Sequence, residues 1–150
     1  MLLIPDLISY VNSLKLHFPE IERDHVVIDD TQLTKFLQDS PNDNKFMIVG
    51  LIPKHNPTGN IDNLQSVDRS TILLLKKVDR SRQTHNQFLT AFAEAQALAR
   101  SVSLKMGLDK MSGDCKIMTF LNVDSLDLDA VWALSSCDGY KIDFSLKTNF

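Results

Sequence analysis

The chain has 150 residues, of which 43% are hydrophobic and 23% charged, and its formal net charge is −3. This size and composition predict one domain with a core of its own and no need of a metal or disulfide framework. The acidic balance argues against a general nucleic-acid binder, which needs a basic stripe to neutralise phosphates. No run of 18 apolar residues is present to span a membrane, and Cys115 and Cys137 are expected to be reduced thiols in the cytoplasm of the producing cell.

The first predicted element is an amphipathic helix that ends before Pro19. Its apolar stripe consists of Leu7, Ile8, Val11, Leu14 and Phe18. A short strand is predicted at residues 25–28, followed by a brief helix that Asp30 or Thr31 caps. Residues 45–52 are apolar without alternation, which predicts a central strand covered on both faces.

Residues 53–69 contain two prolines, a glycine and three asparagines, and they are predicted to form a long loop. We expect this loop to be mobile in the free chain and to become ordered against a partner. The residues that characterise it are Pro53, His55, Pro57, Gly59, Asp62 and Arg69. A second strand at residues 71–78 returns from the loop, so the two strands should form an antiparallel hairpin.

The longest predicted helix covers residues 85–106, with Gly107 at the position of a C-terminal cap. Its main apolar stripe consists of Phe88, Phe92, Ala95, Ala99, Val102 and Met106. Further apolar residues, among them Ala91 and Leu98, lie off this stripe, and charged residues are few. The helix is therefore expected to be covered on more than one side.

Three strands are predicted after this helix. The first covers residues 115–123, and an acidic linker at residues 124–129 follows it. Asp138 and Gly139 are a strong signal for a two-residue hairpin turn between the last two strands. The alternating residues Tyr140, Ile142, Phe144 and Leu146 should then form the buried face. The whole order predicts an α+β domain, with a mostly antiparallel sheet of five or six strands on which the long helix and the N-terminal helix pack.

No catalytic or metal-binding motif is recognisable, and no cofactor is expected. The histidines lie in four different elements without metal-type spacing, and the acidic residues near 124–129 lack the glycine and the final glutamate of a calcium loop. An enzyme would need a site assembled from scattered residues around the long loop. The candidates for such a site are His55, His85, Asp62 and Asp68.

Two charged segments of opposite sign stand out. The acidic one contains Glu20, Glu22, Asp24, Asp29 and Asp30, and the basic one contains Lys76, Lys77, Arg80 and Arg82. A ring with one kind of interface joins two different patches of the same subunit, so such patches must be complementary. The two segments are one candidate pair, with Ala91 and Leu98 as the apolar centre between them.

Taken together, the order of elements resembles the tail-terminator and tail-completion proteins of tailed phages and related contractile injection particles. Three features carry the resemblance: the opening helix LIPDLISYV, the strand pair KFMIVGLI and TILLLKKV ahead of an alanine-rich helix, and the closing strand DGYKIDFSL. The resemblance implies a non-enzymatic structural protein of the virion or injection particle. Its subunits would form a ring, commonly a hexamer, that contacts tail-tube, sheath or connector proteins.

Two alternatives stay open. One is a small cytoplasmic adaptor that binds a single protein partner through the same surfaces. The other is an enzyme with its site around residues 53–69. The ring predicts a discrete multimer in solution, the adaptor predicts a monomer or dimer, and the enzyme predicts a melting temperature that shifts with ligand.

Overall fold

A computed structural model describes residues 1–149 of the chain. The helices are α1 (Ile4–His17), α2 (Asp30–Asp39) and α3 (His85–Ser112). The strands are β1 (Ile21–Val27), β2 (Phe46–Thr58), β3 (Gln65–Lys77), β4 (Leu121–Leu134) and β5 (Cys137–Asn149). Within residues 1–149 this is an α+β fold, as the sequence predicts, and none of the helices described there is long and apolar enough to cross a membrane.

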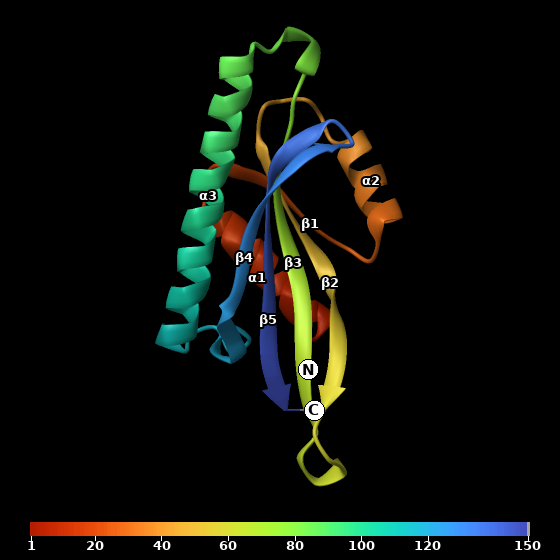
Figure 1. Cartoon of the computed structure of the whole chain (residues 1–150), viewed down its shortest axis with the longest axis vertical. Coiled ribbons are helices and arrows are strands. Elements are labelled where there is room, and N and C mark those ends of the chain that lie inside the picture. The colour runs from red at the N-terminus through yellow and green to blue at the C-terminus, as the bar shows by residue number, and fades with distance from the viewer. Residues whose placement is uncertain (150) are drawn as a thin grey trace.

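The five strands form one sheet in the order β1-β2-β3-β5-β4. Only β1 and β2 run parallel, and the other three strand pairs described are antiparallel. Helices α1 and α3 cover one face of the sheet, and α2 covers part of the other (Figure 1). The long helix and the N-terminal helix therefore pack on the sheet as predicted, and α2 adds a smaller layer on the other face.

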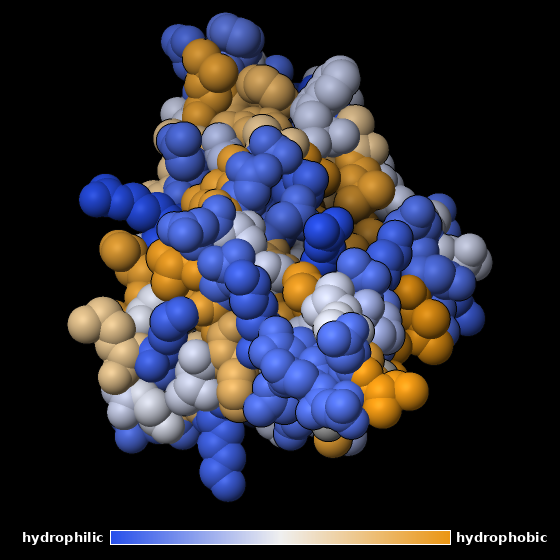
Figure 2. Space-filling view, turned by 60° about the horizontal axis from the view of Figure 1, so that its bottom comes forward, coloured by the Kyte–Doolittle hydropathy of each residue, from blue (hydrophilic) through white to orange (hydrophobic). Residues whose placement is uncertain are grey.

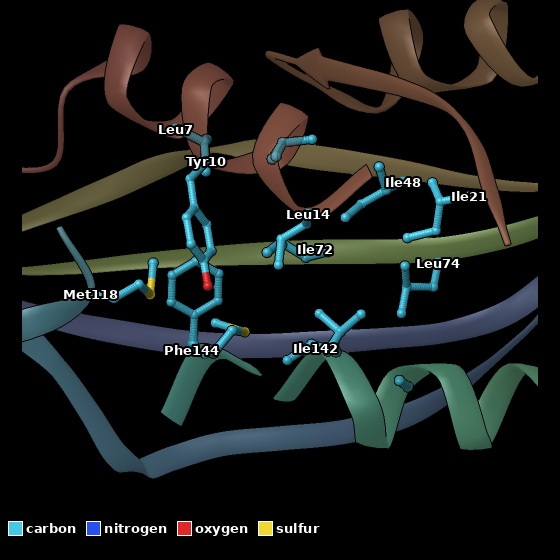
Figure 3. Close-up of a cluster of buried hydrophobic side chains, with 14 of the residues drawn as sticks. Leu7, Tyr10, Leu14, Ile21, Ile48, Ile72, Leu74, Met118, Ile142 and Phe144 are labelled. Carbon is cyan, nitrogen blue, oxygen red and sulfur yellow. The ribbon is translucent and has the colours of Figure 1, made fainter. Parts of the chain in front are cut away.

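The central strands bury side chains on both faces, because successive residues of a strand point in opposite directions. On β2, Ile48 joins the cluster beneath α1 and α3, whereas Met47 and Val49 join the cluster beneath α2. Figure 3 shows the larger cluster, in which Leu7, Tyr10 and Leu14 of α1 point toward Ile72 and Ile142 of the sheet. The prediction of a central strand covered on both faces is confirmed.

The N-terminal helix begins with Pro5 in its first turn, where a missing N–H costs nothing, and it ends at His17. Its buried residues include Leu7, Val11 and Leu14, as predicted. Ile8, however, is 48% exposed, and Tyr10 takes its place in the core. The second helix is capped by Asp29, one residue before the predicted positions.

Helix α3 is 28 residues long and begins with a capping box in which Thr84 and Gln87 satisfy each other's backbone N–H groups. It does not end at Gly107, as predicted, but continues to Ser112. Gly113 follows with φ of 71°, the left-handed conformation that a C-terminal glycine cap requires. The sequence pattern therefore placed the end of the helix at the wrong one of two glycines.

Most of the predicted loop at residues 53–69 is strand. The hairpin of β2 and β3 continues to the pair Thr58↔Gln65, so the connection is only residues 59–64. Strand β1 pairs with β2 no further than Leu51, and beyond that point β2 is an edge strand. Prolines are tolerated on an edge because no neighbour needs their missing N–H, which explains Pro53 and Pro57 within a strand.

The region after α3 also differs from the prediction. Residues 115–120 form turns and a short 3₁₀ helix instead of a strand, and Met118 is fully buried in the core. Strand β4 begins at Leu121 and includes the predicted acidic linker, so only two strands follow α3 within the described residues. Leu126 and Leu128 are half-buried while Asp127 and Asp129 are exposed. This alternation with outward charges is typical of an edge strand.

The last hairpin turns at Ser135 and Ser136, not at the predicted Asp138 and Gly139. Both serines have positive φ, 48° and 65°, and Leu134 pairs with Cys137 across the turn. Asp138 and Gly139 lie inside β5, opposite Lys76 and Leu75 of β3. A Cβ on Gly139 would collide with the carbonyl oxygen of Leu74, so glycine is needed here for close backbone approach and not for a turn.

A turn at Asp138 and Gly139 would have paired Cys137 with Tyr140, but in the structure Tyr140 lies opposite Ala130. The predicted inward face is confirmed. Ile142, Phe144 and Leu146 are at most 3% exposed, and Tyr140 packs against the same cluster from its margin.

Candidate protein-interaction surface

An apolar groove lies between the second half of α3 and the first half of β4. Its volume is about 650 Å³, and nearly all of the surface that lines it is apolar. Three α3 side chains form one wall, and they are 60% (Leu104), 60% (Leu108) and 83% (Met111) exposed. Val123, Leu126 and Leu128 of β4 supply the opposite wall.

The local sequence explains why these side chains remain uncovered. Leu104, Leu108 and Met111 follow one another at spacings of four and three, so they lie on one face of the helix. The buried residues Val102, Met106 and Asp109 lie on a different face, toward the sheet. Gly107 between the exposed leucines carries no side chain, and the space around it is open. The helix thus has one apolar face in the core and a second that the monomer leaves free.

Two cations flank the groove. The ammonium of Lys110 donates to the carbonyl oxygen of Leu121, which ties the end of α3 to the start of β4. Arg100 is exposed and has no ion-pair or hydrogen-bond partner among residues 1–149. An occupant of the groove would therefore be apolar, with a negative charge favoured near Arg100.

On the end of the molecule turned toward the viewer in Figure 2, apolar side chains form separate patches among hydrophilic ones. The groove between α3 and β4 is different, because its apolar side chains adjoin one another and polar residues such as Arg100 and Lys110 border them. Such a surface is typical of protein-binding sites. The sequence-based prediction missed this surface, because it ended the helix at Met106 and left Leu108 and Met111 outside it.

Ala91 and Leu98, which were predicted to form the apolar centre of an interface, differ in exposure. Leu98 is only 6% exposed and belongs to the core cluster, so it is not available to a partner. Ala91 is half-buried. The prediction that Leu98 forms the centre of an interface is therefore wrong, because the core-facing side of α3 is wider than one line of side chains.

All four basic residues of the predicted basic patch contact other groups of the same chain. Lys76 is 3.1 Å from Glu94 and lies over the Phe46 ring, and Lys77 donates to three carbonyl oxygens at the end of α2. Arg80 pairs with the buried carboxylate of Asp138 and lies over the ring of Trp132.

Arg82 is much more exposed than the other three basic residues. It is 88% exposed and 3.7 Å from Asp79, an arrangement that stabilises little. The structure therefore gives three of these cations a role within the monomer, and it leaves one side chain extended into solvent.

In the predicted acidic patch, Asp24 forms a 2.5 Å ion pair with Lys15, and Asp29 accepts the N–H of Gln32 at the start of α2. Burial raises the pKa of Asp24, but hydrogen bonds from Lys15 and Asn12 outweigh it and hold this pKa below its ordinary value. Glu20, Glu22 and Asp30 are exposed, with no ion pair among the described residues.

The residues proposed for an enzymatic site are partly brought together. His55 and Asp68 lie opposite each other in the β2–β3 ladder, and the distance from His55 Nδ1 to Asp68 Oδ1 is 2.7 Å. The carboxylate is fully buried and also accepts hydrogen bonds from Ser66, Thr148 and the N–H of Leu2. Asp62 lies in the exposed hairpin tip, and the ring of His85 stacks on Phe88 at the start of α3.

These contacts assign a structural role to Asp68. Burial alone raises the pKa of its carboxyl group, and the hydrogen bonds from His55, Ser66, Leu2 and Thr148 outweigh that effect, so the pKa lies below its ordinary value. The ionised carboxylate thereby joins the N-terminal segment, β2, β3 and β5 at one point.

A second buried polar pair was not foreseen. Tyr10 of α1 donates its hydroxyl hydrogen bond to Asp109 of α3 at 3.0 Å, and Lys105 forms an ion pair with the same carboxylate. Burial, followed by the charge of Asp109, raises the pKa of Tyr10 far above its ordinary value. The pair fixes the register of the two helices, and no helical spacing in the sequence links residues 99 positions apart.

The cysteines are free thiols. Cys137 is buried, and burial is the main reason that its pKa rises to about 11. Among residues 1–149 no group of three or more histidine, cysteine, aspartate or glutamate side chains is arranged to hold a metal ion.

Comparison with known proteins adds no assignment to this geometry. Neither a protein-family model nor a curated protein matches the chain.

Proposed function

We propose that this chain is a structural subunit that assembles with copies of itself into a ring, in a phage tail or a related injection particle. The observation that carries the proposal is the apolar groove between α3 and β4. Covering exposed leucine and methionine side chains with a partner is favourable, by about 25 cal/mol per Å² of apolar area removed from water.

The type of assembly follows from the resemblance described above, which rests on the opening helix, the central strand pair, the alanine-rich helix and the closing strand. Those elements correspond to α1, to β2 and β3, to α3 and to β5. The ring would be built in the producing cell and would contact tail-tube, sheath or connector proteins in the particle.

Sedimentation velocity over a range of protein concentrations tests the proposal. The expected result is one discrete multimer, which the substitution Leu108→Glu shifts toward monomer because it places a charge in the groove. Leu16→Glu is the matched control, since Leu16 on α1 is 76% exposed and lies outside the groove. A chain that stays monomeric at every concentration would contradict the ring and favour the adaptor, which uses the same groove for a different protein.

A further inference from the structure

The tip of the β2–β3 hairpin is a second exposed apolar feature. Ile61 at this tip is 97% exposed, and Leu64 is 37% exposed. The tip projects beyond the rest of the sheet, at the end of the molecule where the N-terminus lies (Figure 1). A nearly fully exposed isoleucine on a projecting turn has no function in the core of its own monomer.

The tip is also a shaped turn. Residues 61–63 form a 3₁₀ turn, and the N–H of Asn63 donates to the carbonyl oxygen of Asn60 at 2.8 Å. Gly59 enters the turn with φ of 102°, and a Cβ at this position would collide with the carbonyl oxygen of Asn63. A preformed turn loses less conformational entropy on binding than a flexible loop does.

The tip and the groove are complementary in character. The groove is apolar and about 650 Å³ in volume, which is within the ~300–1,000 Å³ of pockets that enclose small ligands, so more than one side chain fits. Next to Ile61, Asp62 is exposed and has no ion-pair partner among residues 1–149, and the unpaired cation Arg100 lies at the margin of the groove.

One subunit does not bring the two surfaces together. The tip connects β2 to β3, the groove is built on β4, and β5 lies between β3 and β4 in the sheet. Two different patches that complement each other across subunits give a heterologous interface, which closes into a ring when the rotation between subunits permits.

We infer that the hairpin tip of one subunit, with Ile61 as its anchor, docks into the α3–β4 groove of a second copy of the chain. This inference rests on the proposed function and specifies its interface. It differs from an interface between the acidic and basic segments, because the burial of apolar side chains provides most of the stabilisation. Asp62 and Arg100 add orientation at the margin, where an exposed ion pair contributes little.

Mixing of two variants tests the inference. Ile61→Asn removes only the apolar anchor of the tip and Leu108→Glu places a charge only in the groove, so each variant by itself should self-associate at least about tenfold more weakly than the parent. A 1:1 mixture retains one intact tip and one intact groove, and it should form a heterodimer that does not grow further. Ile28→Asn is the matched control for the tip, because Ile28 is 65% exposed and lies outside both surfaces.

The possible outcomes separate the two proposals. If the parent chain is monomeric at every concentration, self-assembly itself is wrong. If the parent assembles and Ile61→Asn assembles equally well, the ring stands and tip docking is overturned. If Leu108→Glu loses assembly while the tip variant keeps it, the groove of one copy contacts the groove of the other, which also overturns tip docking.

Discussion

The two faces of α3 are built from similar residues but have different surroundings. Toward the sheet, Ala99, Val102 and Met106 are fully buried, whereas Leu104 and Leu108 on the outer face are each 60% exposed. The comparison teaches that apolar content alone does not define the core of a small domain. An apolar face is part of the core only if another element of the same chain covers it, and α3 has one face that is covered and one that is not.

The largest expected difference in the free energy of unfolding is between the variants Met106→Ala and Leu104→Ala. Met106 is fully enclosed, so its truncation should lower the free energy of unfolding by about 2–5 kcal/mol through lost burial and the cavity left behind. Leu104→Ala should change the stability of the monomer by no more than about 0.5 kcal/mol, because its side chain is largely in water already. Urea unfolding at a concentration where the chain is monomeric measures both. Equal losses would mean that the outer face is also packed, and the comparison would fail.

Adding a single methyl group at each of two glycines tests the same contrast between covered and uncovered positions. Gly139→Ala should destabilise the chain by about 1–3 kcal/mol, since the new Cβ collides with the Leu74 carbonyl and forces β3 and β5 apart. Gly107→Ala lies in the interior of α3 with nothing within 4 Å of the new Cβ, and it should stabilise by about 0.5–1 kcal/mol. Thermal unfolding of the two variants should shift in opposite directions. A stable Gly139→Ala protein would contradict the close approach of the strands.

Gly139 also shows where sequence-based prediction reaches its limit. The Asp138-Gly139 pair matches the residues of a hairpin turn, and local chemistry alone favours that interpretation. In the structure the turn lies at Ser135 and Ser136, and Gly139 is instead in close contact with β3, a strand more than 60 residues earlier in the chain. Information of that kind is absent from a local pattern.

Elements defined by strong hydrophobic periodicity were predictable, and those defined by their position in the sheet were not. The α+β class, α1, the apolar start of β2 and most of α3 follow from spacing of apolar residues. Strand formation at Pro53 and Pro57, and in the acidic segment of β4, depends on these segments lying at edges of the sheet. The groove was not predicted, because Leu108 and Met111 lie beyond the predicted end of the helix and the facing residues of β4 lay in a predicted linker and strand end.

The smallest expected effect compares two aspartates of one hairpin, one at its tip and one a few residues into β3. Asp68 is fully buried and accepts several hydrogen bonds, whereas Asp62 is exposed at the tip. Asp68→Asn should lower the free energy of unfolding at neutral pH by about 1 kcal/mol, because an amide replaces a charged acceptor and presents donors to donors. Asp62→Asn should leave the stability of the monomer unchanged. A stable Asp68→Asn chain would mean that its hydrogen bonds do not offset the burial of the carboxylate.

The contribution of Asp68 to stability should also depend on pH. The hydrogen bonds hold the pKa of Asp68 below its ordinary value in the folded chain, so protons bind this group more tightly when the chain is unfolded. Its contribution is therefore fully present above about pH 4, the range of an unfolded aspartate, and is lost as the pH falls through the lower, folded pKa. The stability difference between the parent and Asp68→Asn should therefore narrow over that acidic range. A gap for Asp68→Asn that is constant from pH 7 down to the acid transition would show that its carboxylate does not titrate with folding.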